Sequence, residues 1–367
     1  MSRPDPRPAS RIAPVLAGAI AWLGVVCGAP ADAAELGFNR VNLGWAKPAE
    51  RQATIDEMKK SGVVSVRLSL SAPVDPSLDA VRIAHAAGLR ILLEISLNNP
   101  DFYPEGTKRR AAKGKSYDAY RLSDLDSERY RVVIRDALAK LDAMGVRLVA
   151  VEPGNEINWA GYNGDLTVSF GKPGSAIKAA NPATVDKGLD RYVGVLRATR
   201  EEMRASKLNR DAKLVSAGLS DMPVPFSRRV GLEIVPPADW TARMQARGID
   251  TLVDAYGIHV YPGSSGTRAR RDGLVREALS FCGADRAGKP CWITEWGVAN
   301  TSPVCPIEDS RRAILVDQVR AIIDRDIKAG RVEAAYYFDW DSKTPYSVWR
   351  CGGLSSAGRA AVRPMAN

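Results

Sequence analysis

The sequence predicts an α/β fold, a single (β/α)₈ (TIM) barrel over residues 34–367 that follows a signal peptide at residues 1–33. Apolar runs of strand length alternate with longer segments of helical period, and eight such pairs follow one another without a break in composition. Continuous apolar strands separated by helices are typical of a parallel sheet covered by helices. Eight units of this kind predict that the sheet closes into a barrel.

The N-terminal segment has the pattern of an export signal. Arginines precede the apolar run IAPVLAGAIAWLGVV, and Ala31-Asp32-Ala33 supplies the small residues that a signal peptidase needs. We therefore expect cleavage near Ala33 and a periplasmic or secreted protein. A membrane anchor is the alternative, but Pro14 interrupts the run, and no later segment stays apolar for the ~18 residues that a span requires.

The strands are expected in a fixed order along the chain. They are RVNLGW (40–45), VVSVRLSL (63–70), LRILLEIS (89–96), VRLVAVEPGNE (146–156), AKLVSAGLS (212–220), VDAYGIHVY (253–261), PCWITEWG (290–297) and VEAAYYFDW (332–340). An open doubly wound sheet is the runner-up, but no G-x-G-x-x-G fingerprint follows the first strand.

Helices are expected between the strands. The clearest cover residues 50–62, 77–88, 126–145 and 187–206, with Asp126 or Ser127 as the N-cap of the third. Long connections follow three strands, at 97–125, 157–185 and 221–238. Connections of this length usually serve a functional site.

The net charge of +10 is spread along the chain. Its densest runs, KRRAAKGK (108–115) and TRARR (267–271), contain no interleaved aromatic residues of the kind that stack on bases, so nucleic-acid binding is not expected. A basic surplus is compatible with an anionic glycan or an anionic cell surface.

Four cysteines follow the signal segment, an even number that favours disulfides in an exported protein. Three pairings are possible. Proximity along the chain favours Cys282–Cys291 and Cys305–Cys351. A zinc site is the alternative, but there is no close cysteine pair and the chain contains only two histidines.

The active site of such a barrel lies at the C-terminal ends of its strands. The residues expected there are Arg67, Asn155, Glu156, His259, Tyr261, Glu295, Trp296 and Trp340. Glu156 and Glu295 end the fourth and seventh strands and would face each other across the barrel mouth. A carboxylic acid opposite a carboxylate is the pair that cleaves glycosidic bonds. Trp159, Trp296 and Trp340 are candidates for stacking on the apolar faces of sugar rings.

The motifs GNE (154–156) and ITEWG (293–297) make the chain resemble the clan of retaining (β/α)₈ glycoside hydrolases, and most closely the cellulase-type enzymes of family 5. The resemblance implies that Glu156 is the acid/base and Glu295 the nucleophile. It also implies that Asn155 binds the sugar 2-hydroxyl and that Trp340 forms a platform under the sugar. Many members carry a histidine at the end of the third strand, whereas this chain reads ISLNNP.

From the same resemblance, Arg67 and Tyr261 would hold Glu295 ionised, and His259 would line the sugar pocket beside Glu156. Arg67 has an alternative role as the partner of a buried acid such as Glu94 or Glu152.

The sequence therefore predicts an exported, monomeric, retaining β-glycosidase that acts on a polysaccharide or oligosaccharide without a metal or cofactor. A non-catalytic glycan-binding barrel is the alternative, and a metal-dependent hydrolase is a third possibility that the two histidines disfavour. Plant-wall glucan, mannan and an anionic bacterial exopolysaccharide all remain open as substrates, as does internal or terminal cleavage.

Overall fold

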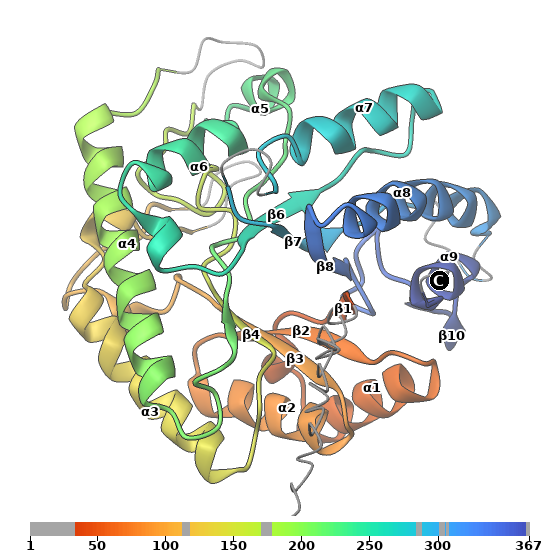
Figure 1. Ribbon diagram of the computed structural model, residues 1–367, viewed down its shortest axis with the longest axis horizontal. Coiled ribbons are helices and arrows are strands. Elements are labelled where there is room, and N and C mark those ends of the chain that lie inside the picture. Colours follow the sequence, from red (N-terminus) through yellow and green to blue (C-terminus); the bar gives the residue numbers. More distant parts are fainter. Residues whose placement is uncertain are drawn as a thin grey trace, which may run out of the picture. The chain divides into compact units, whose positions relative to one another are not determined.

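Eight parallel strands form one sheet at the centre of the fold, and helices cover its outside (Figure 1). The computed structural model describes residues 34–111, 118–169, 178–283, 288–300, 305 and 308–364. The predicted signal peptide at residues 1–33 lies outside these ranges, as do parts of the long connections at 97–125 and 157–185.

The strands of the sheet are β1 Glu35–Asn39, β2 Ser65–Leu70, β3 Arg90–Ile95, β4 Ala150–Pro153, β5 Lys213–Leu214, β6 Tyr256–Val260, β7 Cys291–Trp296 and β8 Val332–Tyr337. A separate hairpin consists of β9 Trp349–Arg350 and β10 Gly353–Leu354. The α-helices are α1 Pro48–Lys60, α2 Val74–Ala86, α3 Ser127–Ala143, α4 Pro182–Ala205, α5 Val224–Val230, α6 Pro237–Gln245, α7 Arg268–Ala278, α8 Ser310–Lys328 and α9 Ser356–Val362. Short 3₁₀ turns are η1 Leu43–Trp45, η2 Pro100–Phe102, η3 Leu122–Asp124 and η4 Ile249–Thr251.

The sheet is closed. Its strand order is β5-β4-β3-β2-β1-β8-β7-β6, so β5 and β6 stand at the two ends. Parallel bridges between Val215 and Ala255 and between Leu219 and Ile258 join these two strands. The eight-stranded, closed (β/α)₈ barrel predicted from the sequence is therefore confirmed.

Large and small side chains alternate in the barrel interior. A buried cluster from β3 to β8 contains Leu92, Ala150, Val215, Ala255, Trp292, Ala334 and Tyr336. Gly37 on β1 leaves room for the ring of Tyr336, because a Cβ at position 37 would lie 2.6 Å from that ring. The larger core packs the helices against the outside of the sheet. A filled interior of this kind confines a substrate site to the ends of the strands.

The first strand was predicted in the wrong place. The strand is Glu35–Asn39, whereas residues 40–45 leave the sheet and form the turn η1. Asn42 adopts a left-handed conformation with φ of 58°, which ends the extended run before the turn. Trp45 consequently lies in the connection between β1 and α1 instead of in the barrel wall, with 64% of its surface exposed.

Other local predictions are confirmed. The carboxylate of Asp126 accepts hydrogen bonds from the backbone N–H groups of Glu128 and Arg129, as an N-cap of α3 should. Both predicted disulfides are present, Cys282–Cys291 at the start of β7 and Cys305–Cys351 between the β7–α8 connection and the β9–β10 hairpin. Among the residues that the structure describes, no helix has the length and apolar character needed to cross a membrane.

Candidate active site

Strands β4, β6 and β7 bring three ionisable side chains together at one end of the barrel. Glu156 follows β4, His259 lies in β6 and Glu295 lies in β7. Glu156 has a φ of 47°, in the left-handed region that non-glycine residues seldom adopt. Its N–H donates to the carbonyl of Gly218 at 2.8 Å, which fixes the turn out of the strand. Unusual backbone conformations of this kind are concentrated at functional sites.

The ring of His259 joins the two carboxyl groups. Its Nδ1 lies 3.1 Å from Glu156 Oε1 and 3.5 Å from Glu295 Oε2. These two carboxylate oxygens therefore lie no farther apart than the sum of the two distances, 6.6 Å. Retaining glycosidases hold their carboxyl groups ~5–5.5 Å apart and inverting enzymes hold them ~6.5–9.5 Å apart. The upper limit of 6.6 Å between the two oxygens covers the whole retaining range and only the shortest separations of the inverting range.

Both oxygens of Glu295 accept strong hydrogen bonds. Arg67 Nη1 donates to Oε1 at 2.7 Å, and the Tyr261 hydroxyl donates to Oε2 at 2.6 Å. The pKa of Tyr261 is raised well above its ordinary value by burial and by the charge of Glu295, so the phenol keeps its proton. Two donors, one of them charged, thus hold the carboxyl group of Glu295 from both of its oxygens.

Arg67 is fully buried in the middle of β2, and all three of its guanidinium nitrogens donate to protein groups. Besides Glu295, it contacts Glu152 Oε2 at 2.6 Å, Asn39 Oδ1 at 3.0 Å and Asn155 Oδ1 at 3.1 Å. Burial lowers the pKa of Arg67, but the charges of Glu152 and Glu295 raise it more, and the net shift is upward. Arg67 thus meets both roles considered for it, since it pairs a buried acid and positions Glu295. Arg67 was also expected among the active-site residues at the strand ends, but it is 0% exposed and does not line the pocket.

His259 was predicted to line the sugar pocket. It is instead fully buried next to Glu156, and it is not among the residues that line the pocket. Burial lowers its pKa, but the charge of Glu295 and the hydrogen bond to Glu156 outweigh burial and raise the pKa above its ordinary value. Gly218 leaves room for the ring, because a Cβ at that position would lie 2.3 Å from His259 Nε2 and 2.5 Å from Thr294 Oγ1.

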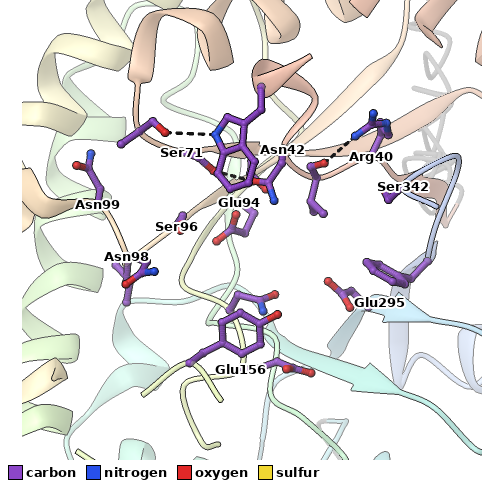
Figure 2. A pocket seen from close by; sticks show the side chains of 18 of the residues that line it. Arg40, Asn42, Ser71, Glu94, Ser96, Asn98, Asn99, Glu156, Glu295 and Ser342 are labelled. Atoms are coloured by element: carbon purple, nitrogen blue, oxygen red, sulfur yellow. Dashed lines mark hydrogen bonds between the residues drawn. The ribbon is translucent and has the colours of Figure 1, made fainter. Parts of the chain in front are cut away.

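A pocket of about 850 Å³ opens beside the two glutamates. Figure 2 shows Glu156 and Glu295 on one side of this pocket and Asn42, Ser71, Ser96 and Asn98 around the rest. Its walls come from the ends of β1, β2, β3, β4, β7 and β8. Asn155 also lines it, so the predicted contact between Asn155 and a sugar stays a prediction.

The predicted tryptophan platforms are wrong. Trp340, Trp296 and Trp159 are 0%, 2% and 8% exposed, and none of them lines the pocket. Strand β8 ends at Tyr337, so the alternation of side chains does not extend to residue 340. The backbone N–H of Trp340 instead donates to the carbonyl of Asn39 at the end of β1, and its ring stacks on Trp349 with ring centroids 5.4 Å apart.

Trp296 and Trp159 are structural for similar reasons. The ring of Trp296 packs edge-on against Tyr337 with centroids 4.9 Å apart. Trp159 forms a backbone bridge with Ile234 and contacts Tyr162, which ties the β4–α4 connection to the segment before α6.

Other aromatic residues line the pocket in their place, namely Trp45, Tyr103, Tyr162 and Phe338. Phe338 follows β8 by one residue and was missed because the strand was read through to residue 340. Trp45 was assigned to the first strand, although Lys47-Pro48 after it is a typical helix start and indicated a loop. The indole N–H of Trp45 donates to the carbonyl of Ala72 at 3.2 Å, which orients the exposed ring.

Glu94 is a further acidic residue at the pocket, considered from the sequence only as a partner of Arg67. It is 3% exposed, lies in β3 opposite Ser69 and Glu152, and lines the pocket. Its Oε1 is buried without a hydrogen-bond partner.

No protein-family model matches the chain, and comparison with curated proteins gives no match either. Solved structures do match. A fungal β-1,4-galactanase has a TM-score of 0.53 at 16% identity, over 89% of this chain and 94% of that chain. A family 5 xyloglucanase from Paenibacillus pabuli has a TM-score of 0.53 at 13% identity, over 89% and 97%. A family 128 endo-β-1,3-glucanase from Sorangium cellulosum has a TM-score of 0.51 at 13% identity, over 91% and 98%.

At these identities the likeness establishes the fold. The chain has the (β/α)₈ architecture of these structures along nearly its whole described length. The neighbours are described as glycoside hydrolases, and one belongs to the family 5 that the motifs GNE and ITEWG resemble.

Proposed function

We propose that the protein is an exported retaining β-glycosidase that hydrolyses a polysaccharide or oligosaccharide. The observation that carries the proposal is the placement of Glu156 and Glu295 on either side of His259 Nδ1, at the edge of one pocket. The described glycoside hydrolases with the same fold support the reaction class.

In the first step, a carboxylate oxygen of Glu295 attacks the anomeric carbon and forms a covalent ester. The glycosidic C–O bond breaks, its electron pair goes to the leaving oxygen, and protonated Glu156 transfers its proton to that oxygen. Arg67, which donates to Oε1, and Tyr261, which donates to Oε2, together orient the carboxylate of Glu295 for this attack.

In the second step, Glu156 is ionised and takes a proton from a water molecule. The water oxygen bonds to the anomeric carbon, the ester C–O bond breaks, and Glu295 leaves as a carboxylate. Two inversions restore the starting configuration. The nearby imidazole of His259 contacts both carboxyl groups and helps to balance the charge that moves between them.

Export is part of the proposal. The basic and apolar N-terminal segment has the signal-peptide pattern, and two disulfides suit an oxidising compartment. A monomeric enzyme cleaved near Ala33 is expected. N-terminal sequencing of the protein recovered from the periplasm or medium tests the cleavage site, and a mature N-terminus far from residue 34 would contradict it.

Hydrolysis of purified glycans tests the reaction, and NMR of the anomeric proton in the first product tests the stereochemistry. We expect a β-anomer to appear before mutarotation. An α-anomer would contradict the retaining mechanism. Binding of a glycan without release of products, by wild type and the Glu295→Gln variant alike, would instead support the non-catalytic glycan-binding alternative.

A further inference from the structure

Glu94 is the buried acid at the pocket that the mechanism above does not use. Figure 2 shows its carboxyl group among the residues that line the pocket, between Ser96 and Glu295. The residue is 3% exposed, and its Oε1 has no hydrogen-bond partner although it is buried. A buried acceptor left unsatisfied is costly, so Oε1 is a candidate acceptor for a donor group that enters the pocket.

The residues that follow Glu94 at the end of β3 also line the pocket. Ser96 follows the strand with a small side chain, and Asn98 and Asn99 stand farther out in the pocket wall. The Asn98 amide donates to the carbonyl of Asp118, and the Asn99 side chain accepts from the N–H of Asp101. These side chains therefore support the loop after β3, and neither hydrogen-bonds the carboxyl group of Glu94.

Charged and titratable groups surround Glu94 on several elements. Arg67 and the Ser69 hydroxyl face it from β2, Glu152 from β4, Glu295 from β7 and Tyr130 from α3. Burial raises the pKa of Glu94 to about 7, the charges of Glu152 and Glu295 add to the rise, and Arg67 opposes it. Glu94 and Glu295 line the same pocket, so a sugar that Glu295 attacks lies in the cavity that Glu94 borders.

We propose that Glu94 is a substrate-contacting residue whose Oε1 accepts a hydrogen bond from a hydroxyl group of the sugar that Glu295 attacks, so that the pocket selects a neutral sugar at this position. A sugar carboxylate there meets the carboxyl groups of Glu94 and Glu295, which both line the pocket. The guanidinium that contacts Glu295, that of Arg67, is fully buried and already donates from all three nitrogens. Burial of like charges without a free partner is strongly unfavourable.

This inference rests on the proposed glycosidase function and narrows its substrate to a neutral glycan at the cleavage position. The basic pocket residues Arg40, Arg109 and Lys343 come from segments outside the β-strands. Arg40 forms an ion pair with Asp341, and Arg109 lies over the ring of Tyr120. The groups that act on Glu94 are Arg67, Ser69, Glu152 and Glu295, and none of these three basic residues is among them.

The test begins with the full chain and soluble β-1,4-galactan, β-1,3-glucan, β-1,4-glucan and β-1,4-mannan. On the best of these, Glu94→Gln and Glu94→Ala are compared with wild type. Gln keeps an acceptor oxygen but loses the carboxyl group, and Ala removes the acceptor, so we expect kcat/KM to fall roughly tenfold for Glu94→Gln and on the order of 100-fold for Glu94→Ala, mainly through KM. Circular-dichroism melting checks that each variant is folded.

Glu35→Gln is the matched control. Glu35 is also a buried carboxylate on a barrel strand, 6% exposed with its pKa raised by burial, but it begins β1 at the opposite end of the barrel and pairs with Arg90 at 2.6 Å. We expect this variant to keep the wild-type KM. A matching rise of KM in Glu35→Gln and Glu94→Gln would show a general effect of losing a buried charge and overturn the inference.

A second arm uses the same glycan after oxidation of its primary hydroxyls to carboxylates. Wild type should prefer the neutral polymer, and Glu94→Gln should reduce that preference several-fold. Wild-type activity with an unchanged KM in both Glu94 variants would overturn the role of Glu94 and leave the proposed function standing. Absence of hydrolysis of every glycan by wild type would overturn the proposed function, and the inference with it.

Discussion

The two carboxyl groups proposed to be catalytic occupy contrasting surroundings. Glu295 is held from both oxygens, by the guanidinium of Arg67 and the hydroxyl of Tyr261. Glu156 is contacted by the imidazole of His259 at 3.1 Å, stands on a left-handed turn and lines the pocket. The difference is the one that our proposal requires of two glutamates with different roles. Donors on both oxygens fix the position of the proposed nucleophile, whereas the proposed acid/base stands at the pocket beside an imidazole.

Replacement of Glu295, the proposed nucleophile, should have the largest effect on activity. Glu295→Gln keeps the size of the side chain but removes the negative charge and the nucleophilic oxygen. We expect kcat to fall by on the order of 10⁴-fold or more, while glycan binding and the melting curve persist. Initial rates together with a binding isotherm measure this. Turnover at the wild-type rate would remove Glu295 from the mechanism.

Replacement of the acid/base should depend on the leaving group, which distinguishes Glu156 from Glu295. Glu156→Gln cannot protonate a departing sugar oxygen, so polysaccharide cleavage should fall ~10²- to 10⁴-fold. An aryl leaving group of low pKa departs without that proton, so formation of the glycosyl-enzyme should be far less affected. Burst kinetics with a dinitrophenyl glycoside measure this step. Equal losses with both substrates would contradict the assignment.

Glu94 is a third carboxyl group at the pocket, and unlike Glu295 it has an oxygen, Oε1, that no donor contacts. Its pKa of about 7 lies above the ordinary 4.5. Between these values the unfolded chain loses the proton while the folded protein keeps it, so the free energy of unfolding falls as pH rises. Glu94→Gln should remove this decline, and its stability relative to wild type should rise by about 3 kcal/mol between pH 4.5 and 7. Urea unfolding across this range measures the difference, and parallel curves for the two proteins would contradict it.

Removal of one donor from Glu295 has the smallest expected effect. Tyr261→Phe deletes the hydrogen bond at 2.6 Å to Oε2 but leaves Arg67 on Oε1. Loss of a hydrogen bond to a charged group corresponds to a decrease in kcat/KM of roughly 10- to 100-fold. Steady-state kinetics on the best glycan test this prediction. A loss as large as that of Glu295→Gln would mean that Tyr261 takes part in the chemistry itself.

Much of the fold follows from local patterns in the sequence. Seven strands are where apolar runs indicated them, because barrel strands buried on both faces read as continuous apolar segments. The first strand, ELGFN, is only five residues long and directly follows the apolar N-terminal region, so the stronger-looking run RVNLGW took its place in the prediction. The polar residues at the ends of β4, β6 and β7 were identifiable because the barrel places them at one mouth.

The pocket walls were harder to predict because they depend on where the chain leaves each strand. Strand β8 ends at Tyr337, and no signal in the sequence marks this end. Because the predicted strand continued to residue 340, Trp340 was expected at the pocket, whereas Phe338 lines it. That Glu94 Oε1 has no hydrogen-bond partner could not be predicted either, because it depends on which side chains lie around it in the folded protein. The positions of the residues at the strand ends are therefore predictable from this sequence, whereas the residues that form the pocket walls are not.

The most direct test of the mechanism is to trap the covalent intermediate. A 2-deoxy-2-fluoro β-glycoside with a good leaving group slows hydrolysis of the ester more than its formation, so the glycosyl-enzyme accumulates. Peptide mass spectrometry of the labelled protein should place one sugar on Glu295, in the segment ITEWG. A label on Glu156 or Glu94, or an active enzyme that never carries a label, would contradict the central claim that Glu295 is the nucleophile.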